Sequence, residues 1–214
     1  MYNEMGRDAI TAFRARGWTI TSGRFARGCV SPDYYISEWD LSKPAKDSRP
    51  DAATSIVTNL YGSNFVVKWK NLTNPTDTGT VWNATGSPFV LTGLTAGAKY
   101  ILMAYPKASG SVLSGLSALS SDTLRLSQVN QWGTNKWQSL SHAFNSCSNM
   151  DITATDVPYL YELGAGNKNL NYMFYGCENL VYNPTINTWR TDSNYEIEER
   201  RVGKECRSRW SPYH

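Results

Sequence analysis

The sequence predicts a β-dominated α+β fold, in which a small domain of short strands lies between pieces of a stacked repeat array. Three observations support this prediction. Charged residues make up only 18% of the chain, below the roughly 25% of an average soluble protein. Apolar residues alternate over short runs in the middle of the chain, which is typical of half-buried strands. A short pattern then occurs twice, which is typical of stacked repeats.

The N-terminal segment, residues 1–22, predicts a short helix over residues 4–16 and a brief strand at Trp18–Ile20. Gly17 lies between them as a helix C-cap. A helix with one apolar stripe needs a partner surface, which we expect to precede Met1 in a longer protein. The apolar residues of the stripe share one face: Met5, Ala9, Ile10 and Phe13.

Residues 23–54 are predicted to form a linker. Within this segment, Tyr34–Leu41 (YYISEWDL) is expected to add a strand. The linker prediction rests on many charges and on the turn-forming residues Gly23, Gly28, Pro32, Pro44 and Pro50.

Residues 55–129 predict a β-sandwich-like domain. Asn64–Lys70 (NFVVKWK) places Phe65, Val67 and Trp69 on one face, which is the alternation of a half-buried strand. Turns rich in Asn, Asp, Gly and Thr separate the remaining strands. These are predicted at Val81–Trp82, Pro88–Leu91, Tyr100–Ala104 and Thr123–Val129.

The most specific local feature of this domain is the spacing of Leu94, Gly97 and Tyr100. It resembles the corner before a late strand in immunoglobulin-like and fibronectin type III-like sandwiches, where a tyrosine hydroxyl bonds to the chain upstream. The span from Ser55 to Leu126 is short for that fold. A polycystic-kidney-type sandwich therefore fits these residues equally well.

The repeat lies in residues 130–195, as two units thirty residues apart. Equivalent residues of stacked repeats lie above one another, so the phenylalanines and cysteines are expected to form buried ladders. The asparagines are expected to hydrogen-bond the turn backbone. The matching positions are Leu140, Phe144, Cys147, Asn149 and Met150 in the first unit and Leu170, Phe174, Cys177, Asn179 and Leu180 in the second.

Two tryptophans, Trp132 and Trp137, precede the first unit and are expected to be core residues that close its first turn. Two units are fewer than the ~3 that an independently stable array needs. We therefore expect the array either to lean on the strand domain or to be truncated.

The two units resemble the repeats of the BspA-like leucine-rich-repeat surface proteins of bacteria. The first unit departs from the core of that repeat, Met-Phe-x-x-Cys-x-x-Leu, with Ala143 and Met150 at its outer positions. The stretch NQWGTNKWQSLSHAF resembles the start of such arrays, and GRDAITAFRARGWTI resembles the closing segment of one. The second unit matches the core at Met173, Phe174, Cys177 and Leu180.

The resemblance covers most of residues 5–190. It implies that residues 1–22 are the C-terminal remnant of a preceding array and that residues 130–195 are a truncated two-unit array. It also implies a non-enzymatic bacterial protein, surface-located or secreted, for adhesion to or recognition of a host protein, matrix component or glycan. Two alternatives remain: a structural spacer or stalk for a binding domain outside this chain, and a phage-encoded decoration protein.

Net charge and hydropathy indicate which classes of partner and location the sequence does not favour. The net charge of +3 is too small to indicate nucleic-acid binding. No apolar run approaches the roughly 20 residues that span a bilayer. The N-terminal residues lack the apolar core of a signal peptide, so an exported protein would carry its signal upstream of this chain.

No catalytic, cofactor-binding or metal-binding residues are predicted. His142 is the only histidine outside residues 196–214, so neither a histidine triad nor a multi-histidine metal site can form. The four cysteines show no metal-ligand spacing. A repeat-core thiol such as Cys147 lacks the exposed, electropositive setting of a nucleophile.

Two further patterns are assigned to turns. The carboxylates that would be needed for an acid–base pair are expected to be solvated: Asp151, Asp156 and Glu162. The two sequons for N-glycosylation, Asn71–Thr73 and Asn83–Thr85, are expected to be turn residues.

The ligand-binding candidates are four tyrosines of the repeat region: Tyr159, Tyr161, Tyr172 and Tyr175. One interpretation has them line one face of the array together with Trp189, because aromatic-rich faces of repeat proteins bind proteins or glycans. The other interpretation, which we favour at this stage, places most of these rings in the core.

The C-terminal residues 196–214 differ from everything before them. The string EERRVGKECRSRWSPYH is charged, has no apolar period and resembles the in-frame translation of a short-read sequencing adapter. We expect it to be an assembly artefact, with the gene cut soon after Tyr195. The competing interpretation is a basic nucleic-acid-binding tail, and reading the raw DNA separates the two.

Overall fold

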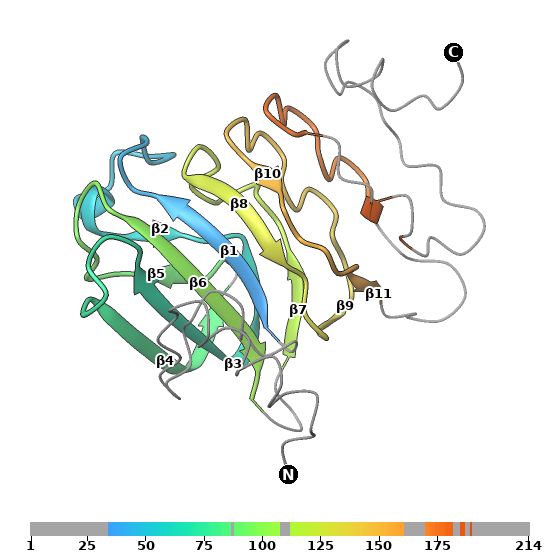
Figure 1. The fold of residues 1–214 in the computed structure, drawn as a ribbon, viewed down its shortest axis with the longest axis horizontal. Helices are drawn as coiled ribbons and strands as arrows, with labels where there is room; N and C mark the ends of the chain where they lie inside the picture. The colour runs from blue at the N-terminus through green and yellow to red at the C-terminus, as the bar shows by residue number, and fades with distance from the viewer. Residues whose placement is uncertain are drawn as a thin grey trace, which may run out of the picture. The chain divides into compact units, whose positions relative to one another are not determined.

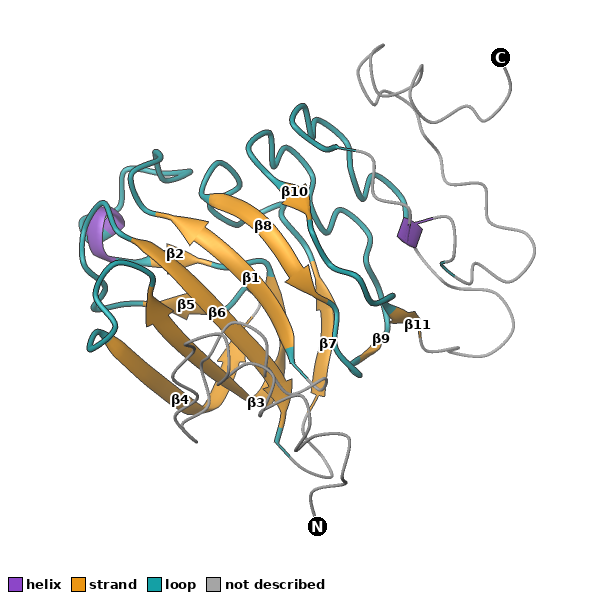
Figure 2. Ribbon diagram, viewed as in Figure 1, coloured by secondary structure: helices purple, strands orange, loops and turns teal. Residues whose placement is uncertain are grey.

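The computed structural model describes residues 34–86, 88–107, 112–160, 170–181, 185–186 and 189. These residues form a β-dominated fold, in which helical structure is confined to short 3-10 segments such as η1 (Ala52–Thr54) (Figure 2). The predicted helix, the strand at Trp18–Ile20 and the segment 196–214 lie outside the described residues. No helix in the described part of the chain is long and apolar enough to cross a membrane.

The described residues contain eleven strands: β1 (Tyr35–Asp40), β2 (Ile56–Val57), β3 (Leu60–Asn71), β4 (Thr78–Gly86), β5 (Val90–Leu91), β6 (Lys99–Pro106), β7 (Val112–Leu116), β8 (Leu126–Gln131), β9 (Lys136–Trp137), β10 (Asp151–Ile152) and β11 (Tyr159–Leu160). The main sheet is open and mixed, with the order β10-β8-β1-β6-β3-β4, and β7 also pairs with β3 (Figure 1). Its strands pair antiparallel except for β8 and β10. Two small sheets, β2–β5 and β9–β11, accompany it.

β1 occupies the middle of the sheet, although it lies in the segment expected to be a linker. It pairs with β6 on one side and with β8 on the other. Tyr35 and Trp39 alternate onto the core face and are each 1% exposed. The strand expected at Tyr34–Leu41 is confirmed, and the folded domain therefore begins before residue 55.

The part of that segment that follows β1 is tied to the turn before β8 by Arg125. Its guanidinium donates to the carbonyl oxygens of Lys43 at 2.9 Å, Ala52 at 2.7 Å and Ser55 at 2.8 Å. Arg125 is itself buried, and burial lowers its pKa. Residues 43–55 therefore follow a fixed path along the sheet and do not behave as a free linker.

A buried carboxylate, Asp122, completes this attachment. It accepts hydrogen bonds from the backbone N–H groups of Lys46 at 2.9 Å and Val57 at 3.0 Å. The guanidinium of Arg49 lies 2.6 Å from the same carboxylate. Because Asp122 is 0% exposed, its charge depends on these partners for compensation.

β3 carries the alternation expected for Asn64–Lys70. Phe65 and Val67 are fully buried, and Trp69 packs partly buried against the same core. The strand is longer than expected because its first part pairs with β7 and its remainder with β4 and β6. The other expected strands overlap β4, β5, β6 and β8, whereas β2, β7, β9, β10 and β11 were not expected.

Tyr100 forms the expected corner at the start of β6. Its hydroxyl oxygen accepts a hydrogen bond from the N–H of Thr95 at 2.8 Å and donates to the carboxylate of Asp77. The amide of Asn71 donates to the same carboxylate at 2.9 Å. Gly97 takes a φ of +70° in the turn between Thr95 and Tyr100. The corner prediction is confirmed.

After β7 the chain forms three stacked loops, residues 117–125, 141–150 and 171–181, coloured from yellow-green to orange-red in Figure 1. The first of these loops connects β7 to β8, so the two repeat units lean on the strand domain. Hydrogen bonds join neighbouring loops: Ala118 N to His142 O (2.8 Å), Asn149 Nδ2 to Leu124 O (2.8 Å), His142 N to Asn171 O (2.9 Å) and Asn179 N to Ser148 O (3.2 Å).

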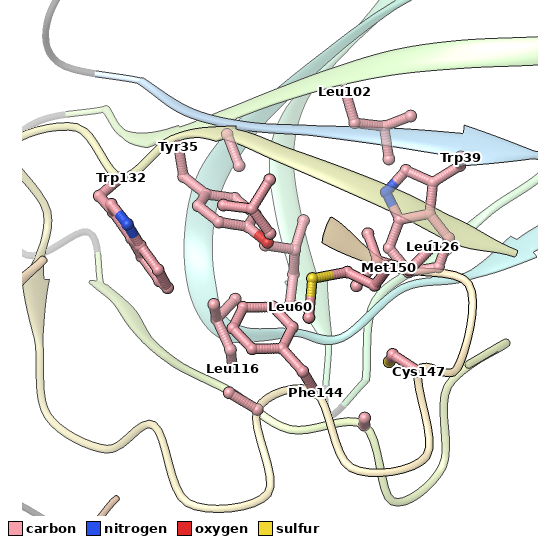
Figure 3. Packing of buried hydrophobic residues seen from close by; sticks show 14 of the residues in the cluster. Tyr35, Trp39, Leu60, Leu102, Leu116, Leu126, Trp132, Phe144, Cys147 and Met150 are labelled. Atoms are coloured by element: carbon pink, nitrogen blue, oxygen red, sulfur yellow. The ribbon is translucent and has the colours of Figure 1, made fainter. Parts of the chain in front are cut away.

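One continuous core joins the sheet to the stacked loops. Figure 3 shows Phe144 and Met150 pointing from the second loop toward Tyr35 and Leu60 of the sheet. All four are at most 1% exposed. Trp132 and Trp137 are each 0% exposed, which confirms them as core residues. The loops therefore cannot separate from the sheet without exposing large aromatic surfaces.

Candidate functional site

The second and third stacked loops repeat one backbone conformation. N–H groups of the second loop donate to carbonyl oxygens of the third in a regular series, with Phe144 N to Met173 O at 2.9 Å and Ser146 N to Tyr175 O at 2.7 Å. Each bond runs from the N–H of residue i to the carbonyl oxygen of residue i + 29, which is the pattern of parallel segments. It places residue i of one loop against residue i + 30 of the next, as the stacked rings of Phe144 and Phe174 show. Side chains at equivalent positions therefore lie side by side.

The inner side of these loops is scaffold. The rings of Phe144 and Phe174 stack with centroids 5.7 Å apart and planes 12° apart, as expected for a ladder. Cys147 and Cys177 are free thiols, and both are buried. Burial raises the pKa of the Cys147 thiol, so it carries no thiolate at neutral pH. The Sγ of Cys177 donates to Phe144 O at 3.0 Å, a further bond between the two loops.

The outer side carries the exposed rings of Tyr172 and Tyr175 and the half-buried ring of His142, and we call these three residues the aromatic ladder. The rings of His142 and Tyr172 stack with centroids 5.0 Å apart and planes 28° apart. Tyr175 lies 6.2 Å from Tyr172 with its plane turned by 80°. Tyr172 is 42% exposed and Tyr175 39% exposed. Two rings thus form an open corner to solvent, with the imidazole beside it.

Two of the three ladder residues have an unfavourable backbone conformation. His142 has a φ of 55° and Tyr172 a φ of 54°, in the left-handed region that suits glycine or asparagine. A non-glycine residue held there costs about 1–3 kcal/mol. The other left-handed position of the loops is occupied by Ser146 and, in the second unit, by Gly176. Of these two left-handed positions, only the one at His142 and Tyr172 carries an aromatic ring in both loops.

The structure brings together two of the four tyrosine candidates. Tyr172 and Tyr175 belong to the aromatic ladder. Tyr159 is 55% exposed but lies in β11, away from the three loops in sequence, and Tyr161 lies outside the described residues. From the sequence, His142 was expected to face solvent or to pack as a spacer, and not to act in a triad or a metal site. Its position thirty residues before Tyr172 was the signal that pairs the two rings.

The carboxylates considered as an acid–base pair bind backbone groups. Asp156 accepts from the N–H groups of Trp132 at 3.0 Å and Gly133 at 2.8 Å. Asp151 accepts from the N–H of Val181 at 3.1 Å. Glu162 lies outside the described residues. The two described carboxylates therefore hold turns through hydrogen bonds from backbone N–H groups.

His142 has one polar side-chain contact among the described residues. Its Nδ1 lies 2.9 Å from the Oγ of the adjacent Ser141. No carboxylate contacts the imidazole within the described ranges, so this pair lacks the third group that orients a catalytic histidine. Across those same ranges, no cluster of three His, Cys, Asp or Glu residues has the arrangement of a metal site.

The two sequons occupy different environments. Asn71 is 1% exposed, and its side chain bonds Asp77 and the backbone N–H of Thr73 at 2.9 Å each. It is therefore a turn-forming residue, as expected. Asn83 is instead an exposed residue of β4, because this strand continues past the Val81–Trp82 segment that was expected to form it.

No family model matches the chain, and neither a curated protein nor a solved structure matches it. The aromatic ladder is therefore interpreted from its own geometry.

Proposed function

We propose that this chain belongs to a non-enzymatic surface or secreted protein of bacteria, which recognises a host protein, matrix component or glycan. The observation that carries the proposal is the aromatic ladder, which presents Tyr172 and Tyr175 to solvent on loops fixed by regular hydrogen bonds. Tyrosine is enriched at recognition surfaces because its large, amphipathic ring loses little conformational entropy on binding.

The fold supports a more specific architecture within this proposal. The stacked loops, with their phenylalanine and cysteine ladders, support a BspA-like leucine-rich-repeat array. The corner at Tyr100 supports an immunoglobulin-like or fibronectin type III-like sandwich for the strand domain. In this architecture the strand domain caps the array, because its loop 117–125 forms the first layer of the stack.

A structural spacer or stalk is the second candidate. The continuous core favours it, because buried aromatic residues join the sheet and the stacked loops into one stiff body. A stalk needs such stiffness but needs no exposed ring. The two functions therefore differ in what they require of the aromatic ladder.

The test is a binding assay with the full chain. Collagen, laminin, mucin and a panel of oligosaccharides are immobilised, and binding is measured by surface plasmon resonance. The adhesion proposal expects at least one saturable interaction, which the double variant Tyr172→Asn, Tyr175→Ser abolishes. Trp82→Ser is the matched control, because Trp82 is 53% exposed on β4. Absence of binding to every surface would favour the stalk.

A further inference from the structure

We infer that the aromatic ladder is a binding site for neutral sugars. This inference rests on the proposed recognition function and names the chemistry of its ligand.

The backbone indicates that the rings serve binding rather than folding. At His142 and Tyr172 the left-handed conformation favours glycine or asparagine, and the ring of Tyr172 still remains 42% exposed, so it gains less from packing than a fully buried ring. Backbone strain that packing does not repay clusters at functional sites. The inner ladder, by contrast, places Phe144 and Cys147 in full burial on ordinary backbone.

The groups around the rings favour an uncharged ligand. Across residues 141–150 and 171–181 the only Asp, Glu, Lys or Arg is Glu178. Sulfated or carboxylated sugars are held by arginine and lysine, which these loops lack. The two loops instead carry exposed amide and hydroxyl groups, on Ser146, Asn171 and Asn179. Such groups both donate and accept, as sugar hydroxyls do.

The size of the corner favours a sugar over a protein. Tyr172 and Tyr175 have centroids 6.2 Å apart and planes at 80°, so a pyranose ring on one face also meets the edge of the other. The negative face of an aromatic ring attracts the weakly positive C–H groups of a sugar. A stable protein interface buries about 800 Å² on each partner, far more than these two partly exposed rings supply.

The experiment measures the full chain against four probes: soluble β-1,3-glucan, yeast mannan, heparin and collagen. We expect saturable binding to a neutral glycan and none to heparin. Tyr172→Asn and Tyr175→Ser each weaken glycan binding at least tenfold, whereas Trp82→Ser leaves it unchanged. Tyr172→Asn also leaves the thermal midpoint unchanged or raised, because asparagine accepts the left-handed backbone. That readout separates loss of a contact from loss of the fold.

Each other outcome overturns the inference in a recognisable way. Binding to collagen alone would refute the sugar ligand and leave the recognition function standing. Binding to heparin alone would refute the neutral-ligand argument. A Tyr172→Asn variant with a lowered midpoint, together with unchanged glycan binding by Tyr175→Ser, would make the ladder part of the scaffold. No binding to any probe would refute both the inference and the proposed function.

Discussion

The strand domain and the stacked loops are stabilised by different kinds of contact. In the strand domain, buried charges link segments far apart in sequence, as when Arg125 binds the carbonyl oxygens of Lys43 and Ser55. In the stacked loops, backbone hydrogen bonds and apolar ladders link equivalent positions of adjacent loops. Within the described residues, every ion pair involves residues 40–125. The two regions nevertheless share one core.

The two kinds of contact differ in how much sequence change they tolerate, and hence in where a binding surface can evolve. A buried ion pair fixes one geometry and tolerates little change around it. A layer of the stack needs only its inward residues and its backbone bonds, so its outward residues are free to vary. The aromatic ladder lies on that outward side. The predictions below test each half of this comparison and then the contact that joins the two.

The largest effect is expected from Asp122→Ala. The change leaves the Arg49 guanidinium and the Val57 N–H without their buried carboxylate, and breaking such a pair costs about 3–5 kcal/mol. Urea denaturation followed by tryptophan fluorescence measures the loss. Asp47→Ala is the control, because its side chain is 61% exposed in an ion pair with Arg49, and the change should leave the stability almost unchanged. Equal effects would refute the buried-charge account.

The next effect compares the two phenylalanines of the inner ladder. Phe144→Ala removes a fully buried ring that contacts Trp132 and Phe174, and we expect a loss of about 3–4 kcal/mol. Phe174 is only partly buried, so Phe174→Ala should cost roughly half as much. The same denaturation experiment measures both. If Phe174→Ala were the more damaging, the stack would depend on its outer layer and not on the sheet.

The features of this architecture that depend on local residue spacing could be predicted from the sequence. The ladders of Phe144 and Phe174 follow from one repeated pattern, and the corner at Tyr100 follows from three residues within one turn. These features depend on contacts that the spacing itself defines. The strand at Tyr34–Leu41 was likewise visible in the sequence.

Long-range pairing was not visible in the sequence. The central place of β1 depends on partners more than sixty residues away, such as Tyr100 opposite Trp39, and no local pattern encodes that. Loop 117–125 shares hydrogen bonds with the repeat but none of its side-chain pattern, so only two of three layers were recognised. The ring of His142 was missed because its left-handed backbone cannot be inferred from residue type.

The contact between the two regions should respond to Gly115→Ala. Gly115 lies in β7 beside Ser139, and an added Cβ would stand 2.8 Å from the Ser139 carbonyl oxygen. Pushing these two backbones apart should cost about 1–3 kcal/mol, as overpacking does. Amide hydrogen exchange should show the loss of protection spreading into the loop 141–150. Unchanged exchange there would mean that the loops fold independently of β7.

The smallest effect is a change in acid sensitivity on Asp77→Asn. Hydrogen bonds from the Tyr100 hydroxyl, the Asn71 amide and the Thr95 hydroxyl hold the pKa of Asp77 below its usual value. The unfolded chain therefore protonates this carboxylate at a higher pH than the folded chain does. The stability that the ionised Asp77 contributes is complete above the unfolded pKa of about 3.9, and it is lost as the pH falls through the folded pKa. We expect the variant to be slightly less stable at neutral pH and to lose less stability on acidification. Thermal midpoints from neutral pH down to about pH 2 measure the difference.

Asp47→Asn is the control, because Arg49 lowers the pKa of that carboxyl as well but solvent surrounds it. An acid limb that Asp77→Asn leaves unchanged would mean that the Tyr100 corner holds without a charged partner.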